Sequence, residues 1–265
     1  MARIAVAATA PFGAEILEEL ARRHEIAYLL TQPDRPRGRG RKVAPPPAKE
    51  AAERLGIPVR QPERLGSEFD PEVETVVTVA YGQLVPRGAL ERARWLNVHP
   101  SLLPRWRGAA PVERSLMAGD EETGVSVIEL VEELDAGPIA AQSRFPIGPD
   151  DDAGAVFGHV RGLTPDLVEA AMANRQPAPQ GDEGVTYAEK ITPADRDLDW
   201  SRPPQELHNL IRALSPHIGA RGVVEGRPVI VWRSRLVDGS LELLEVQPEG
   251  RRRMTYDEFL RGLRR

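Results

Sequence analysis

The segment RIAVAATAPFGAEILEELARRHEIAYLLT, residues 3–31, indicates the fold class most clearly. It opens with an apolar run at 4–8, which we expect to form a buried strand. An amphipathic helix is predicted over 14–23, because its apolar residues share one face and its charged residues the other. A second strand is predicted over 25–31. A strand, a crossover helix and another strand make the βαβ unit from which parallel sheets are built.

The same alternation continues through the first two thirds of the chain, which predicts an α/β fold with a mostly parallel sheet. Further strands are expected at 75–80, 95–99, 123–130 and 139–145, and helices at 48–55 and 152–173. The glycine-rich G-x-G-x-x-G fingerprint does not follow the first strand, where TAPFG stands at 9–13. This argues against a nicotinamide enzyme.

The last third of the chain has a different pattern. Residues 175–184 (RQPAPQGDEG) lose all periodicity and are typical of a linker. After them we expect a helix at 204–214, short antiparallel strands at 222–224, 228–232 and 241–246, and a basic helix at 256–265. The expected organisation is a catalytic domain at 1–174, a linker at 175–203 and a small domain at 204–265.

Composition narrows the class of protein. The chain has 265 residues, of which 41% are hydrophobic and 28% charged, which excludes a disordered or fibrous protein. Its 35 Lys and Arg against 40 Asp and Glu give a formal charge of −5, which by itself argues against a nucleic-acid partner. The absence of cysteine excludes disulfides, thiolate zinc sites and cysteine nucleophiles, and favours the cytoplasm. No membrane segment is expected, because no apolar run approaches the roughly 18 residues required.

The segment 95–111, WLNVHPSLLPRWRGAAP, carries the clearest chemical signal. Asn97 and His99 lie two apart on an expected strand, so their side chains leave the same face. Pro100 keeps His99 out of helical geometry, at the strand end where α/β proteins bind ligands. An amide that stabilises an oxyanion beside an imidazole that moves a proton suits acyl transfer. The alternative is that His99 is an ordinary polar residue at a strand end.

Asp135 is the candidate partner of this pair. A carboxylate beside an imidazole orients the ring, and Asp135 lies in the loop EELDAG at 132–137, where Gly137 permits a close backbone approach. The alternative is a simple turn aspartate before a glycine.

Longer motifs around these residues carry a family resemblance. The run NVHPSLLPRWRGAAP at 97–111, TGVS at 123–126 and LDAG at 134–137 closely resemble the folate-dependent formyltransferases. The chain is most similar to the members that act on an aminoacyl-tRNA, through TQPDRPRGRGRK at 31–42, VAYGQLVP at 79–86, and YAEKI at 187–191 with Asp199 and Trp200. The resemblance runs from residue 3 to about residue 260.

The resemblance implies a Rossmann-like catalytic domain followed by a small OB-like β-barrel. It implies formyl transfer from 10-formyltetrahydrofolate to the α-amino group of methionine esterified to initiator tRNA, with Asn97, His99 and Asp135 as catalytic residues. Folate-binding positions follow from the motifs: Gln83, Leu84, Val85, Ser101, Leu102, Leu103, Pro104, Ala136 and Gly137. No metal is expected, and the family expectation is a cytoplasmic monomer that does not bind membranes.

A cationic stretch at 35–42 revises the argument from net charge. Its five cations are not balanced by any acid, and the intervening Gly and Pro predict an exposed, mobile loop. By resemblance this loop enters the acceptor-stem region of tRNA, and Arg39 matches the key arginine of the family. The expected tRNA-binding residues are Arg35, Arg37, Arg39, Arg41 and Lys42, with a second cluster formed by Arg251, Arg252, Arg253, Arg261, Arg264 and Arg265.

The chain departs from the family in its C-terminal region. After Trp232 it passes through Val237-Asp238-Gly239 almost directly to 241–248, so a block of strands that completes the family barrel is missing. We expect a partial barrel and weaker tRNA affinity. The alternatives are a folate-dependent N-formyltransferase acting on an amino-sugar nucleotide, a transformylase acting on glycinamide ribonucleotide, and a tRNA- or folate-binding protein without catalysis.

Overall fold

The computed structural model describes residues 1–37 and 42–263, and the chain divides into two compact units. Unit 1 comprises Met1–Arg107, Gly124–Arg144 and Val160–Val185, and unit 2 comprises Gly108–Thr123, Phe145–His159 and Thr186–Arg265. Four of the arginines singled out above lie outside the described residues: Arg39, Arg41, Arg264 and Arg265.

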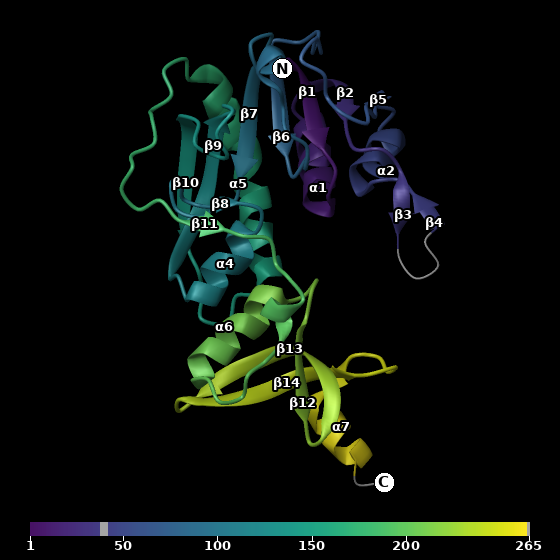
Figure 1. Cartoon of the computed structure of the whole chain (residues 1–265), viewed down its shortest axis with the longest axis vertical. Helices are drawn as coiled ribbons and strands as arrows, with labels where there is room; N and C mark the ends of the chain where they lie inside the picture. Colours follow the sequence, from purple (N-terminus) through teal and green to yellow (C-terminus); the bar gives the residue numbers. More distant parts are fainter. Residues whose placement is uncertain (38–41, 264–265) are drawn as a thin grey trace. The chain divides into compact units, whose positions relative to one another are not determined.

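A seven-stranded sheet with the order β10-β9-β7-β6-β1-β2-β5 forms the central layer (Figure 1). Four neighbouring pairs, from β5 across to β7, are parallel, and β9 runs antiparallel to β7. The predicted α/β fold with a mostly parallel sheet is therefore confirmed. The strands are β1 (Arg3–Ala8), β2 (Glu25–Leu30), β5 (Val59–Arg60), β6 (Thr75–Val79), β7 (Arg94–His99), β9 (Glu122–Glu129) and β10 (Ile139–Pro146).

Helix α1 (Pro11–Ala21) begins three residues earlier than the apolar pattern indicated. Pro11 explains the difference. The ring of proline fixes its φ angle at a helical value, and the N–H that proline lacks would have no partner within the first turn of a helix, so proline is favoured at the first helical position. At Gly13 the helix passes close to the sheet: an added Cβ would lie 2.7 Å from the Val79 carbonyl oxygen and 2.8 Å from Ala8 Cβ. The other helices around the sheet are α2 (Pro47–Arg54), α3 (Arg87–Leu90) and α5 (Ala153–Ala173).

The two ends of the cationic stretch are more regular than expected. Strands β3 (Arg35–Arg37) and β4 (Lys42–Ala44) pair as an antiparallel hairpin, whereas the composition predicted a loop without regular structure. Two strands can pair through backbone hydrogen bonds without a packed core. Side-chain composition does not predict such pairing, because every residue other than proline carries the backbone N–H and C=O groups that make it. The base of the hairpin is held by Asp34, whose carboxylate accepts hydrogen bonds from Lys49 Nζ at 2.9 Å and Gln61 Nε2 at 2.8 Å.

Unit 2 contains a four-stranded antiparallel sheet with the order β12-β13-β14-β15. Its strands are β12 (Ala220–Val224), β13 (Arg227–Val237), β14 (Ser240–Pro248) and β15 (Met254–Thr255). Strand β13 is longer than the expected 228–232, because Asp238 and Gly239, with φ angles of 49° and 77°, form the tight turn that continues the β13–β14 ladder to its end. The predicted short antiparallel strands are therefore confirmed, and they form a small four-stranded sheet.

Helix α6 (Pro204–Leu214) has the bounds that its apolar spacing predicted, and it packs on this sheet. Leu207, Ile211 and Leu214 join strand residues Val231 and Val246 in one buried core. The remaining elements of the chain are α4 (Pro111–Ala118), α7 (Tyr256–Leu263), β8 (Arg107–Gly108), β11 (Tyr187–Ala188) and the 3₁₀ helix η1 (Ala194–Arg196). Among the described residues, no helix is long and apolar enough to cross a membrane.

Asp195 forms an ion pair with Arg114 of helix α4. Its carboxylate accepts hydrogen bonds from Arg114 Nη1 at 2.9 Å and Nη2 at 3.2 Å, and from the hydroxyl and backbone N–H of Thr192 at 2.7 Å each. These hydrogen bonds lower the pKa of Asp195 to about 2, and the bonds from Arg114 contribute more than those from Thr192. A carboxyl with a lowered folded-state pKa stabilises the protein above its unfolded pKa, and the contribution is lost as pH falls through the folded value.

We therefore expect Asp195→Asn to lower the free energy of unfolding by about 1–2 kcal/mol at neutral pH. Urea denaturation should show that the difference from the wild type shrinks below about pH 4, where Asp195 of the unfolded chain begins to be protonated, and is lost as pH falls through the folded-state pKa of about 2. Asp182→Asn, at an exposed position, is the control and should change stability little at any pH. A difference between Asp195→Asn and wild type that stays constant from neutral to acid pH would contradict the assignment.

Candidate active site

Asn97 and His99 lie at the carboxyl end of β7, where the strand leaves the sheet. Pairing of β6 with β7 places Thr78 opposite Asn97. The Thr78 hydroxyl lies 2.9 Å from Asn97 Oδ1, and Asn97 Nδ2 points to Asp135 Oδ1 at 3.4 Å. With its oxygen turned to a hydroxyl donor and its NH₂ group to a carboxylate, the amide of Asn97 has a defined orientation.

The ring of His99 lies between two acceptors. Nε2 is 2.7 Å from the carbonyl oxygen of Trp106, and Nδ1 is 3.6 Å from Asp135 Oδ2. Both side chains are buried, with 5% of His99 and 9% of Asp135 exposed. Because a carbonyl oxygen can only accept a hydrogen bond, the contact with Trp106 requires a proton on Nε2 of His99. Nδ1 then faces the carboxylate of Asp135. The structure thus brings Asn97, His99 and Asp135 together.

The loop after His99 is held by a buried serine from β9. Ser126 Oγ donates to the Ser101 carbonyl at 2.7 Å and accepts the Leu103 N–H at 3.1 Å. Gln142 Nε2 reaches both Ser126 Oγ at 2.8 Å and the Leu103 carbonyl at 3.1 Å. Ser101 and Leu103 are buried, whereas Leu102 and Pro104 are partly exposed. The loop therefore has a fixed course directly beside His99.

The other expected folate-binding residues follow neighbouring strands. Gln83, Leu84 and Val85 come after β6, and since β6 and β7 are parallel, the segments after them leave the same edge of the sheet. The side chain of Leu84 is 84% exposed. In the loop after β9, Gly137 is buried and Ala136 is partly exposed. Just before Gln83, burial raises the pKa of Tyr81 to about 12, so its phenol stays neutral.

Three partners in this site are not marked by any motif in the sequence. Thr78 orients Asn97, the Trp106 carbonyl holds His99, and Gln180 donates to the backbone carbonyls of the Asp135 loop. The contact of Thr78 with Asn97 can be inferred only when the register of β6 and β7 is known. The partner of His99 is a backbone carbonyl, a group that every residue has, so the sequence does not distinguish Trp106. Gln180 lies in the stretch at 175–184 whose composition is typical of a linker.

Of the expected tRNA-binding residues, Arg35 and Lys42 are exposed, as are Arg251, Arg252, Arg253 and Arg261 of the second cluster. Arg35 and Lys42 stand on the β3–β4 hairpin, with Arg37 at the end of β3. Arg251, Arg252 and Arg253 follow β14, and the Arg253 guanidinium lies 3.4 Å from the ring centre of Trp232 and donates to the Pro216 carbonyl at 2.8 Å. Among the described residues, no group of three or more His, Asp or Glu side chains could hold a metal ion.

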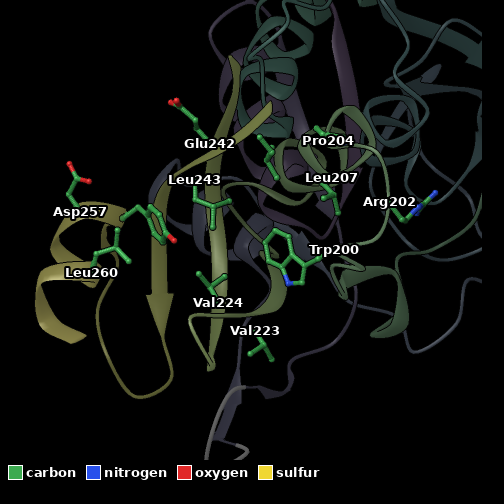
Figure 2. Close-up of a pocket in the computed structure, with 12 residues that line it drawn as sticks. Trp200, Arg202, Pro204, Leu207, Val223, Val224, Glu242, Leu243, Asp257 and Leu260 are labelled. Atoms are coloured by element: carbon green, nitrogen blue, oxygen red, sulfur yellow. The ribbon is translucent and has the colours of Figure 1, made fainter. Parts of the chain in front are cut away.

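Unit 2 also contains an apolar hollow of about 850 Å³ (Figure 2). Trp200, Val224 and Leu243 point toward it, while the carboxylates of Glu242 and Asp257 lie at its outer edge. Trp200 is 40% exposed and Val223, on the same rim, is 59% exposed. No residue expected to act in catalysis or folate binding lines this hollow.

The comparisons with known proteins agree with one another. Residues 2–171 match the family model described as formyl transferase, and residues 190–240 match that of the formyl transferase C-terminal domain. The chain is 40% identical over 291 aligned positions to methionyl-tRNA formyltransferase of Paracoccus denitrificans (strain Pd 1222), covering 98% of this chain and 97% of that protein. It is 39% identical to methionyl-tRNA formyltransferase of Halorhodospira halophila (strain DSM 244 / SL1), covering 99% and 97%.

Solved structures show the same fold. The N-formyltransferase from Helicobacter canadensis in complex with folinic acid and dTDP-3-aminofucose has a TM-score of 0.67 and 18% identity, covering 90% of this chain and 89% of that chain. The alignment with the Paracoccus protein is longer than the 265 residues of this chain, so the chain lacks residues that this relative has.

Gly137 illustrates how tightly the Asp135 loop is built. A Cβ at this position would lie 1.7 Å from the carbonyl oxygen of Glu129, so only glycine permits the backbone to pass β9 here. We expect Gly137→Ala to lower the free energy of unfolding by about 3 kcal/mol or more, since backbone atoms cannot move aside at low cost. Gly181→Ala is the control, because a Cβ there has no neighbour closer than 4.0 Å. Equal stability of the two variants in urea denaturation would show that the close approach is wrong.

Proposed function

The chain belongs to the formyl transferase family, and on that premise we propose that it transfers the formyl group of 10-formyltetrahydrofolate to the α-amino group of methionyl initiator tRNA. The observation that carries the proposal is the buried cluster of Asn97, His99 and Asp135, in a chain 40% identical over nearly its whole length to a methionyl-tRNA formyltransferase. The acceptor is present where translation takes place, so the proposal includes a cytoplasmic enzyme. It also includes that the enzyme acts as a monomer.

Asn97 is proposed to stabilise the oxyanion. When the amine nitrogen attacks the formyl carbon, a C–N bond forms and the carbonyl oxygen takes up negative charge. Because Thr78 lies against Oδ1 of the Asn97 amide, Nδ2 remains the group that faces the site and can donate to that oxygen. The buried environment strengthens this interaction relative to water.

His99 and Asp135 are proposed to move the proton. The amine must lose a proton as it adds, and N10 of the folate must gain one as its bond to the formyl carbon breaks and tetrahydrofolate leaves. Nε2 of His99 is bound to the Trp106 carbonyl, so the exchange of protons falls to the Nδ1 side, where Asp135 Oδ2 is 3.6 Å away. The carboxylate orients the ring and balances the charge of its doubly protonated form.

The folate donor is proposed to bind along the loops that follow β6, β7 and β9. Backbone groups of 83–85 and of 135–137 suit a pterin, because a planar ring with several donors and acceptors is recognised by backbone N–H and C=O groups. The bonds of Ser126 and Gln142 to the loop at 101–103 preform one wall of this site.

The acceptor tRNA is proposed to bind through charge. The β3–β4 hairpin presents Arg35 and Lys42 to solvent, and the arginines after β14 form a second cationic surface. Cations of this kind contact phosphates without reading sequence. The shortened C-terminal region offers less surface than that of the longer relatives, so weaker tRNA affinity with formyl transfer preserved is part of the proposal.

A formyl-transfer assay tests both the reaction and the site. We expect the wild type to formylate initiator Met-tRNA in preference to elongator Met-tRNA and an amino-sugar nucleotide. Asn97→Ala and His99→Ala should each lower kcat by about 10²–10³-fold or more, because each removes a preorganised group at the reacting centre. Their folate affinity and melting temperature should stay near wild type. Activity on the amino-sugar nucleotide alone would overturn the choice of acceptor, and near-normal turnover in either variant would overturn the site.

The salt dependence of tRNA binding tests the role of the hairpin. Replacing both Arg35 and Lys42 by alanine should weaken tRNA binding and reduce the slope of log affinity against log salt by about 1–2, since each lost phosphate contact contributes about 0.9 in duplex DNA. Fluorescence anisotropy between about 50 and 300 mM KCl measures the slope. Arg92→Ala, an exposed cation outside the hairpin strands, is the control. An unchanged slope in the double variant would show that the hairpin does not contact the tRNA.

A further inference from the structure

The side chain of Gln180 joins the two loops that hold His99. Its Nε2 donates to the carbonyl oxygens of Asp135 and Gly137, at 2.7 Å each. Its Oε1 accepts from Arg107 Nε at 3.1 Å and from Arg107 Nη2 at 2.9 Å. Arg107 is the residue after Trp106, so the amide spans from the loop that binds Nε2 of His99 to the loop that binds Nδ1.

The chemistry of this position requires an amide. Both N–H donors and both lone pairs of the Gln180 side chain are used, which is the full hydrogen-bonding capacity of the group. The opposite orientation would place the NH₂ group, a donor, against the guanidinium of Arg107 and the amide oxygen, an acceptor, against two carbonyl oxygens. The network therefore defines the positions of Nε2 and Oε1. A carboxylate of the same size would still bind Arg107 but would meet the two carbonyls without a proton to donate.

The two loops depend on bonds of this kind because their backbones are not relaxed. Trp106 has a φ of 66° and Asp135 a φ of 48°, values that residues other than glycine adopt at a cost. Arg107 is 7% exposed, and its Nη1 lies 3.6 Å from Glu133 Oε1 in the same loop as Asp135. The bonds that Gln180 and Arg107 make therefore hold both backbone conformations in place.

We propose that Gln180 is a positioning residue for catalysis: it holds the Asp135 loop and the Trp106 loop at a fixed separation, so that the His99 ring keeps both of its partners. The inference rests on the proposed function for its catalytic consequence. Among the described residues, the side chain of Gln180 hydrogen-bonds to the carbonyl oxygens of Asp135 and Gly137 and to Arg107, so it acts through Asp135 and His99. The stretch at 175–184 thereby supplies a residue to the site, in addition to connecting the chain.

The predicted consequence is a selective loss of turnover. Without the amide, Asp135 and the Trp106 carbonyl can separate, and the His99 ring loses its defined orientation. Small displacements of a catalytic group lower the rate of the chemical step much more than the binding of substrates. Gln180→Glu and Gln180→Ala should therefore lower kcat by about 10–100-fold, while KM for folate and for the acceptor stays within about threefold of wild type.

The experiment is a double-mutant cycle with a matched control. Gln180→Glu is measured alone and together with Asp135→Asn, in single-turnover assays with the acceptor that the wild type uses. If Gln180 acts through Asp135, the second substitution should cost less than about threefold once Asp135 is already replaced. Gln176→Glu, in the same segment and exposed, should leave kcat unchanged. The same fold loss in both backgrounds, or a rise in KM without loss of kcat, would overturn the proposal.

A second readout does not depend on turnover. The ¹⁵N resonances of the His99 ring, identified by their loss in His99→Gln, report whether Nε2 and Nδ1 keep their partners. They should shift in Gln180→Glu and Gln180→Ala and remain in place in Gln176→Glu, with all three proteins folded. Unchanged His99 resonances in both Gln180 variants would overturn the proposal that Gln180 positions His99. Inactivity of the wild type on Met-tRNA would overturn only the proposed function, because the His99 resonances can be measured without turnover.

Discussion

The His99 ring is held from both sides by oxygen acceptors that come from different loops. The Trp106 carbonyl lies 2.7 Å from Nε2, and Asp135 Oδ2 lies 3.6 Å from Nδ1. Neither loop can move without changing the environment of one nitrogen. The surrounding structure serves to keep this arrangement: Ser126 holds the first loop, the close approach at Gly137 holds the second, and Gln180 bridges them.

The parallel sheet explains why these loops meet. Strands β6 and β7 run side by side, so the segments after Val79 and after His99 leave one edge together. Antiparallel β9 places Ser126 beside His99 in the register, which anchors the loop that begins at Pro100. The central strands are buried and cannot slide without exposing their apolar side chains, so the register of the sheet sets the geometry of the site.

Charge is distributed separately from this chemistry. The chain has an excess of acids, yet the β3–β4 hairpin and the arginines after β14 carry cations that are exposed. In the proposed function the buried cluster performs the reaction and the exposed cations bind the polyelectrolyte acceptor. The antiparallel sheet of unit 2 leaves Trp200 and Val223 partly uncovered beside an apolar hollow, in a chain that lacks residues present in its longer relative.

The amino-acid sequence by itself determined the order and type of the main elements, because apolar periodicity reports which face of each strand and helix is buried. It also indicated the Asn97–His99 pair and the close approach at Gly137, which depend on local spacing. The orientation of these groups depends on tertiary contacts. Thr78 contacts Asn97 through strand register, the partner of His99 is a backbone carbonyl, and Gln180 reaches Asp135 from a distant segment. Such contacts join residues far apart in the chain, so no local pattern encodes them.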